Sequence, residues 1–275
     1  MAYQFLSFPG FKHKAVTLSY DYGTPTDKRL IEIMSEYGLK GTFNINSGMF
    51  DEKHRLSADD VLELYTSSGQ EVAIHGVKHL SLTEVDDVSV MKEIMEDREA
   101  LEELFGHIIT GMAYANGKYD DRVVDILAHC GVTYARTVIS TENFDVPTDW
   151  LRMPTTCHHK NPRLMELAKA FVEAETPSYF WRYKPKLFYV WGHSNEFKIN
   201  DNWNVIEEFA AYIGNRDDIW YATNGEIYDY VKAYESLVYT VSRKYVYNPT
   251  QIDVYLNWYG KQILVPAGKT VSLVD

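Results

Sequence analysis

The sequence predicts an α/β fold with a parallel sheet, and three observations lead to that prediction. Short runs rich in β-branched and aromatic residues alternate with longer helical patterns through most of the chain, and this alternation is typical of parallel sheets. The chain has 275 residues, 45% of them hydrophobic, so it can bury one large core. Seven strand–helix units are recognisable, and such a set either closes into a barrel or stays an open, doubly wound sheet. Periodicity alone leaves both architectures open.

The first predicted strand covers residues 15–20, where β-branched and aromatic side chains mix as in a buried strand. A helix is expected next, because apolar residues recur at helical spacing between Asp27, at an N-cap position, and Gly38, where a helix C-terminal glycine belongs. Ser57 followed by Asp60 resembles the capping box of a second helix. The six further predicted strands cover residues 41–46, 71–74, 108–114, 133–137, 187–191 and 219–222.

The pattern changes near residue 237, where three short β-rich runs are separated by turn signals. These runs cover residues 238–241, 252–255 and 262–265. They predict a small antiparallel β unit over residues 237–275, appended to the larger domain over residues 1–236. A lid or brace packed on that domain is the first interpretation of the unit, and a carbohydrate-binding or oligomerising module is the second.

Composition and charge restrict the class of partner. The chain carries 39 acidic against 27 basic residues, a net charge of −12, which disfavours nucleic acid and anionic membranes as partners. A small neutral or cationic molecule is therefore expected, and aromatic residues, 14% of the chain, suffice to line a sugar site as well as the core. The oligomeric state does not follow from the sequence.

Localisation and redox state follow only indirectly. The N-terminus lacks a positively charged start followed by an apolar run, and about 18 consecutive apolar residues occur nowhere. A cytoplasmic protein is expected on this basis, unless the chain was trimmed. Cys130 and Cys157 lie at neither zinc-site nor CxxC spacing, so both are predicted to be packed thiols and not a disulfide.

Candidate catalytic residues follow several of the predicted strands. Asp21 and Tyr22 directly follow the first strand, and Gly23 opens the turn. A carboxylate at a strand end reaches the mouth of a barrel, although a single aspartate there is more often a turn or helix cap. His75 and His79 follow the third strand, four residues apart, and could converge on one metal ion.

Two later segments could complete such a site. His193 follows an apolar strand and would face the same mouth, where an imidazole could protonate a leaving amine, although a lone histidine is more often structural. Asp145, Asp149 and Trp150 lie in a loop after the fifth strand. The two carboxylates could cap turns or orient a catalytic histidine, and Trp150 could offer an apolar wall to an acetyl methyl group or a sugar face.

These segments, in this order, resemble the five motifs of the polysaccharide deacetylases, the NodB-like carbohydrate esterases, over about residues 14–235. The matches are Ser19 to Gly23 for Thr-Phe-Asp-Asp-Gly, His75 to His79 for His-Ser/Thr-x-x-His, Ala113 to Gly117 for Arg-x-Pro-Tyr-Gly, Asp145 to Trp150 for Asp-x-x-Asp-Trp, and Trp191 to His193 for Leu-x-His. The third match keeps only its final glycine. The resemblance implies a distorted barrel of seven strands and so favours the barrel over the open sheet.

The resemblance also implies roles for individual residues. Asp21 would be the general base that deprotonates a water, and His193 would be the acid that protonates the departing amine. His75 and His79 would hold a divalent metal, expected to be zinc, which polarises the acetyl carbonyl. A backbone N–H near Asn116 would help to hold the oxyanion.

One departure from the family pattern concerns the metal. Tyr22 stands where the family has a metal-binding aspartate, and a phenol with a reference pKa of about 10 is a poor ligand. Three alternatives follow: Asp21 itself binds the metal, His158 or His159 completes the site, or no metal binds firmly.

A second departure concerns the arginine that steadies the base in the family. Ala113 occupies its position. Arg152 could replace it through a bidentate ion pair with Asp21, and the alternative is that Arg152 forms a surface salt bridge.

These motifs are compatible with three functions. The first is a hydrolase that removes an acetyl group from an N-acetylated sugar or oligosaccharide with a divalent metal. The second is a metal-independent amide hydrolase, because metal-independent relatives of this family open cyclic amides such as allantoin. The third is a catalytically degenerate protein that binds carbohydrate. The predicted substrate-binding residues are Tyr114, Asn116, Trp150 and Arg152.

Overall fold

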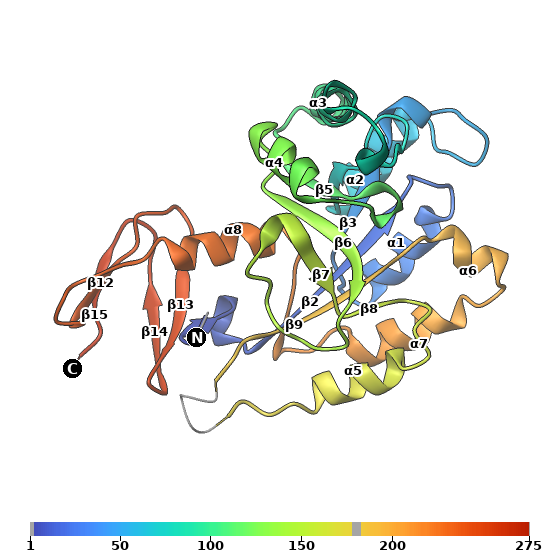
Figure 1. Ribbon diagram of the computed structural model, residues 1–275. Helices are drawn as coiled ribbons and strands as arrows, with labels where there is room; N and C mark the ends of the chain where they lie inside the picture. Colours follow the sequence, from blue (N-terminus) through green and yellow to red (C-terminus); the bar gives the residue numbers. More distant parts are fainter. Residues whose placement is uncertain (1–2, 178–182, 275) are drawn as a thin grey trace.

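The computed structural model describes residues 3–177 and 183–274 (Figure 1). Its centre is a nine-stranded sheet in which paired strands run parallel, in the order β7-β6-β5-β4-β3-β2-β9-β8, with β10 also beside β2. The strands are β2 (Lys14–Asp21), β3 (Gly41–Ile45), β4 (Glu71–Ile74), β5 (Gly111–Ala113), β6 (Tyr134–Ser140), β7 (Met153–Thr155), β8 (Cys157–His158), β9 (Lys186–Gly192) and β10 (Ile219–Tyr221). The predicted α/β fold with a parallel sheet is confirmed.

The two ends of this sheet meet in one extended segment, so the sheet closes into a barrel. β7 pairs with β6, β8 pairs with β9, and only Thr156 separates β7 from β8. The Thr156 backbone N–H donates to the Tyr189 carbonyl oxygen at 2.9 Å. β2 is buried at all eight positions and takes β10 along its first half and β3 along its second. This uneven closure is the distorted barrel that the resemblance implied.

All seven predicted strands are present, with shifted ends, but the sequence pattern misses β7 and β8. These two strands span three and two residues and include a proline, so they show no recognisable alternation. Because β7 runs parallel to β6, with Met153 beside Arg136, the chain must first return to the amino-terminal edge of the barrel. The loop that ends at Trp150 therefore does not end at the mouth.

Helices cover the outside of the barrel, with α3 and α4 on one side and α5 and α7 on another (Figure 1). They are α1 (Asp27–Glu36), α2 (Ala58–Ser68), α3 (Asp87–Phe105), α4 (Asp121–His129), α5 (Leu164–Val172), α6 (Asn195–Ile199), α7 (Asn204–Ile213) and α8 (Asn224–Glu235). Ser57 caps α2 as predicted, because its Oγ accepts the Asp60 backbone N–H at 3.1 Å. Within the described ranges no helix has the length and apolar character needed to cross a membrane.

Two small antiparallel sheets lie beyond α8, away from the other helices (Figure 1). The first contains β1 (Leu6–Ser7), β13 (Val254–Trp258) and β14 (Lys261–Val265); the second contains β11 (Val238–Tyr239), β12 (Tyr245–Tyr247) and β15 (Thr270–Ser272). The three runs predicted after residue 237 correspond to β11, β13 and β14. Their core includes Ala233 and Leu237 at the end of α8, and β1 pairs with β13, so this unit joins the N-terminal segment to the C-terminal one. Cys130 and Cys157 are free thiols, as predicted.

Candidate active site

Asp21 lies at the end of β2, at the carboxyl-terminal edge of the strands, which is the mouth of the barrel. Its side chain is buried and forms ion-pair contacts with Arg136 of β6, whose Nη2 lies 2.7 and 2.6 Å from the two carboxylate oxygens. The Asn44 amide of β3 donates to Oδ1 at 2.8 Å. Three strands therefore fix one carboxylate in position.

The charge state of Asp21 follows from this environment. Burial alone would raise the pKa of its carboxyl group, but the Arg136 guanidinium, with the imidazoles of His75 and His193, lowers the pKa below its ordinary value. Asp21 is therefore an ionised carboxylate at neutral pH, as a general base must be.

Arg136 corrects the expectation about Arg152. Arg152 pairs with Asp149 at 2.9 Å and with Asp121 at 2.6 Å, and both partners are exposed. Neither partner is Asp21, so the alternative of a surface salt bridge is confirmed. Arg136 is the register partner of Ala113 on the neighbouring strand, so the guanidinium reaches the barrel interior from one strand further along.

Arg136 could have been recognised in the sequence. It is a single charged residue inside the predicted strand 133–137, and its side chain is 1% exposed. An arginine is almost never fully buried unless it is paired. Its guanidinium also lies 4.4 Å over the ring of Trp191, a cation–π contact that helps to orient it.

His193 follows β9 and stands between two carboxylates. Its Nε2 lies 3.7 Å from Asp21 Oδ2, and its Nδ1 lies 3.5 Å from Glu196 Oε1. The side chain is 20% exposed, so a substrate at the mouth can reach it. The structure thus brings together Asp21 and His193, the predicted base and acid.

Glu196, on α6, is a site residue that the sequence analysis missed. His158 Nε2 and His159 Nε2 lie 3.4 and 3.1 Å from its Oε2, and Lys160 Nζ lies 2.7 Å from Oε1. Burial alone would raise the pKa of Glu196, but His159, His193 and Lys160 beside it hold the pKa well below its usual range. A permanently ionised Glu196 favours hydrogen on His193 Nδ1 and leaves Nε2 to exchange protons at the mouth. In the sequence, the signal that could have identified Glu196 is its position three residues after His193.

Gly192 makes this arrangement possible. A Cβ atom at residue 192 would stand 2.0 Å from His159 Nδ1, so a side chain there would displace the His159 imidazole. The backbone of β9 and the end of β8 can approach closely only because this position is glycine.

His75, His79 and Tyr22 form the other part of the mouth. The ring centroids of His75 and His79 are 4.7 Å apart, and the Tyr22 ring lies 5.6 and 5.2 Å from them. The Tyr22 ring also stacks on His193 at 4.8 Å with an interplanar angle of 13°. The phenol thus occupies the space shared by three imidazoles.

Tyr22 has an unusual backbone. Its φ of 93° lies in the region that favours glycine, which costs about 1–3 kcal/mol for such a residue. Two hydrogen bonds hold it there: its N–H donates to the Asn44 carbonyl at 2.9 Å, and Arg55 Nη1 donates to its carbonyl at 2.7 Å. The Arg55 guanidinium also lies 4.6 Å over the phenol ring. Burial and the nearby Asp21 charge raise the Tyr22 pKa.

His75, one of the predicted metal ligands, carries its hydrogen on Nδ1 and leaves Nε2 available to a metal. His75 Nδ1 is 2.9 Å from the Ala113 carbonyl oxygen and must donate to it, so the buried Nε2 carries a lone pair and has no partner among the described residues. Burial lowers the pKa of His75 to about 4, which keeps the imidazole neutral. This is the form in which histidine binds a metal.

A third protein ligand next to His75 and His79 is missing from the described residues. Asp21 Oδ2 lies 3.9 Å from His75 Nε2, but both Asp21 oxygens contact the Arg136 guanidinium. Tyr22 offers only a phenol. Catalytic zinc sites usually have three protein ligands, so the present residues supply two-thirds of such a site. They do not fit a complete one.

His158 and His159 do not complete that site. Within residues 3–177 and 183–274, the group with metal-ligand spacing is His158, His159 and Glu196, which lies on the far side of His193. His158 Nδ1 accepts the Lys160 backbone N–H at 3.1 Å, so its Nε2 carries the hydrogen and donates toward Glu196. A ligating histidine needs the opposite arrangement, and the group is therefore better described as a cluster of ion-pair contacts around Glu196.

The predicted substrate-binding residues lie apart from Asp21. Trp150 is 5% exposed and packs edge-on against Tyr228 at the amino-terminal edge of the barrel, so it offers no wall at the mouth. Tyr114 is 2% exposed and its hydroxyl donates to the Leu151 carbonyl, so it is not a stacking surface either. Asn116 is exposed in the loop after β5, where its amide donates to Ser81 Oγ at 3.1 Å; its role stays a prediction.

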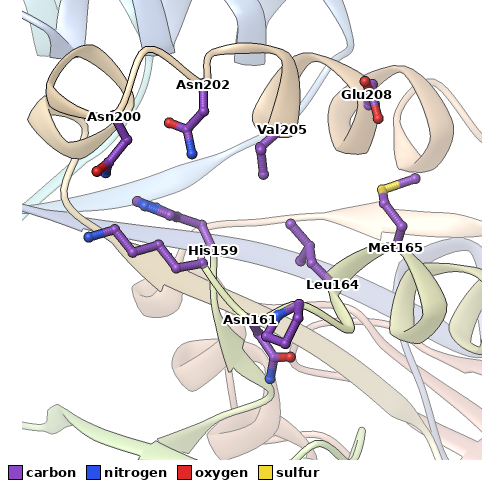
Figure 2. A pocket seen from close by; sticks show the side chains of 10 residues that line it. His159, Asn161, Leu164, Met165, Asn200, Asn202, Val205 and Glu208 are labelled. Carbon is purple, nitrogen blue, oxygen red and sulfur yellow. The ribbon is translucent and has the colours of Figure 1, made fainter.

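A pocket of about 530 Å³ opens beside His159 (Figure 2), and Asp21 is not among its lining residues. Apolar side chains form one part of its lining and amides, a lysine and a glutamate form the rest. Its lining residues are His159, Lys160, Asn161, Pro162, Leu164, Met165, Asn200, Asn202, Val205 and Glu208. Figure 2 shows Leu164, Met165 and Val205 facing one another across the pocket, with Asn200 and Asn202 nearer His159.

The sequence of the barrel is similar to that of one known protein family. A family model described as polysaccharide deacetylase matches residues 9–135, which include the strand ends that carry Asp21, His75 and His79. Over these residues, which are somewhat less than half of the chain, it is a distant homologue of the polysaccharide deacetylase family.

Individual polysaccharide deacetylases resemble the chain only distantly. Chitin deacetylase 1 of Cryptococcus neoformans var. grubii is 28% identical over 139 residues, which are 48% of this chain and 28% of that protein; the chain thus spans only part of this curated relative. A protein of Mycobacterium smegmatis assigned to the polysaccharide deacetylases has a TM-score of 0.61 at 20% identity, over 84% of this chain and 94% of that one. A mutant of a CE4 family pseudoenzyme has a TM-score of 0.51 at 15% identity, over 78% and 67% of the two chains. The two structural likenesses show a shared fold alone.

Proposed function

We propose that this chain is a hydrolase that removes the acetyl group from an N-acetylated sugar or oligosaccharide, with Asp21 as base and His193 as acid. The observation that carries the proposal is the 3.7 Å distance between Asp21 Oδ2 and His193 Nε2 at the mouth. A base and an acid this close can act on the two ends of one reaction, attack by water and departure of an amine.

Asp21 and His193 together account for both proton transfers of the reaction. Water loses one proton to the Asp21 carboxylate as its oxygen bonds to the acetyl carbon. The C–N bond then breaks as the His193 imidazolium gives its Nε2 proton to the departing nitrogen, which leaves acetic acid and a free amine. Proton transfer from Asp21 to His193 restores the starting state, and the acetic acid ionises in water.

Two neighbours position this pair. Arg136 keeps Asp21 ionised and fixed, and Glu196 holds His193 with Nε2 facing the mouth.

A divalent ion belongs to the proposal only as a partner of His75 and His79. Zinc is the expected ion, because imidazoles are among its preferred ligands. When bound, such an ion polarises a carbonyl oxygen. With two protein donors in place of three, we propose that this binding is weak.

The sugar class has independent support from the pocket beside His159. Apolar side chains with amide groups around them suit a sugar, whose C–H faces and hydroxyl groups need both kinds of contact. The pocket would take a sugar unit next to the one that carries the acetyl group. The relative named chitin deacetylase agrees with this class.

A second candidate, hydrolysis of a cyclic amide without metal, is favoured by one observation. Arg136 occupies both oxygens of Asp21 while Tyr22 fills the space between the imidazoles, which leaves the pair of histidines without a carboxylate ligand. Water attack on a ring amide uses the same base and acid.

Acetate release and ring opening distinguish the two candidates. The purified chain would be incubated with triacetylchitotriose and, separately, with allantoin, each with added zinc and with a chelator. Acetate from the sugar supports the first proposal, and allantoin opening without acetate release supports the second. If neither substrate reacts in any condition, both are wrong for these substrates, and the carbohydrate-binding alternative gains.

A further inference from the structure

Tyr22 combines a position at the mouth with an unusual backbone conformation. It stands at the mouth directly after Asp21, and its backbone is held at a φ of 93° by hydrogen bonds to Asn44 and Arg55. Residues kept in such conformations cluster at functional sites, where surrounding contacts over-determine them. The conformation therefore points to a use for this side chain.

The phenol ring is fixed in its direction. His193 stacks on it at 4.8 Å, the Arg55 guanidinium lies 4.6 Å from its centroid, and His79 approaches edge-on at 5.2 Å. A ring with contacts of these three kinds has little freedom to rotate away. Such preorganisation is what makes a donor effective in a transition state.

The Tyr22 hydroxyl is the unused part of this side chain. Within the described ranges, no hydrogen bond joins it to another residue, and the side chain is only partly buried. A phenol with a reference pKa of about 10 keeps its proton at neutral pH. The mouth therefore contains one oriented, neutral O–H donor without a partner, next to the ring of the predicted acid His193.

We propose that Tyr22 is a catalytic residue whose hydroxyl donates a hydrogen bond to the carbonyl oxygen of the scissile amide and stabilises the oxyanion. This role rests on the proposed amide hydrolysis. Tyr22 transfers no proton: Asp21 still takes the proton of water and His193 still gives one to the amine, so the balance of the reaction is unchanged. Polarisation of the carbonyl by Tyr22 needs no metal at His75 and His79.

The test is Tyr22→Phe, which removes one oxygen and keeps the ring that stacks on His193. The matched control is Tyr245→Phe, an exposed tyrosine of β12 in the C-terminal unit. Acetate release from triacetylchitotriose, with a chelator present, is measured as kcat and KM separately. We expect kcat to fall about 10²-fold in Tyr22→Phe, the scale of losing one oxyanion donor, with KM changed much less and the control equal to the wild type.

A second readout does not depend on turnover. Acetate, the product, has oxygens that accept the same hydrogen bond, and its binding can be followed by calorimetry or by NMR line broadening. Weaker acetate binding by Tyr22→Phe than by the wild type supports the donor role even if no sugar is cleaved, and in that case only the proposed function fails. Equal acetate binding by the two forms, or a kcat within about threefold of the wild type, overturns the donor role and leaves the proposed function standing.

Discussion

One half of the mouth has its charges paired, and the other has aromatic rings in contact with one another. The paired half consists of Asp21, Arg136, His193, Glu196, His158, His159 and Lys160. The open half consists of Tyr22, His75 and His79. In the paired half each carboxylate contacts several donors, whereas in the open half the His75 Nε2 has no partner among the described residues.

The difference shows how one site can keep its acid–base pair while its metal-binding side changes. Charges in the paired half are mutually dependent, because removing one leaves another buried without compensation. The open half carries neutral rings, so Tyr22 can stand beside two histidines at little electrostatic cost. The comparison predicts large stability effects in the paired half, and effects mainly on ligand binding and turnover in the open half.

The largest stability effect is expected for Arg136→Met. It leaves the buried Asp21 carboxylate without its cation, which costs about 3–5 kcal/mol. The matched control is Arg152→Met, which removes exposed ion pairs worth about 0–1 kcal/mol. Urea unfolding of both variants measures the contrast, and equal losses would show that the two arginines do not differ in the way described.

A smaller effect is expected for Glu196→Gln, in the same half. The charged hydrogen bonds of Glu196 are worth about 1.5–3 kcal/mol at neutral pH. Because the folded state lowers the pKa of Glu196, its contribution is complete above the unfolded reference value of about 4.3 and is lost as the pH falls through the lower folded value.

The difference in unfolding free energy between the wild type and Glu196→Gln should therefore be constant from pH 8 to pH 5 and shrink at lower pH. Denaturant unfolding at a series of pH values measures this. Glu166→Gln, at an exposed position paired with Arg163, serves as the control. A difference that stays constant down to pH 3 would contradict the pairing described for Glu196.

The smallest expected change is in the open half, for Tyr22→Asp. An aspartate tolerates positive φ better than a tyrosine and adds a carboxylate beside His75 and His79. We expect zinc to bind about 10- to 100-fold more tightly, at least the scale by which an outer partner of a zinc ligand changes affinity. Titration against a fluorescent chelator measures this, with Tyr22→Asp/His75→Ala as the control that should lose the gain. Equal zinc affinity in the wild type and Tyr22→Asp would mean that the open half is not an incomplete metal site.

The sequence pattern was sufficient for the parallel sheet, the family resemblance for the barrel, and the strand ends for the two site residues that follow strands directly. Asp21 and His193 end neighbouring strands, so a parallel sheet must bring them to the same edge. Arg136 and Glu196 were missed because neither stands in a recognised motif. The first enters from the middle of a strand and the second from a short helix, and only the closed barrel brings them to Asp21 and His193.

The misplacement of Trp150 and Arg152 has one physical cause. Both precede β7, which is too short to show in the sequence pattern, so the loop before it seemed to end at the mouth. The strand pairing sends that loop to the opposite edge. Tyr114 follows β5 as expected, but its hydroxyl is used by the Leu151 carbonyl, a contact that no local pattern reveals.

If Asp21 and His193 catalyse hydrolysis of an N-acetyl amide, acetate release from triacetylchitotriose should depend on Asp21, and proton NMR can follow this release for the wild type and Asp21→Asn. Circular dichroism confirms that both remain folded. We expect steady acetate release by the wild type and a loss of about 10²–10⁴-fold in Asp21→Asn, the contribution expected of a general base. Equal acetate release by the two folded proteins would contradict this expectation.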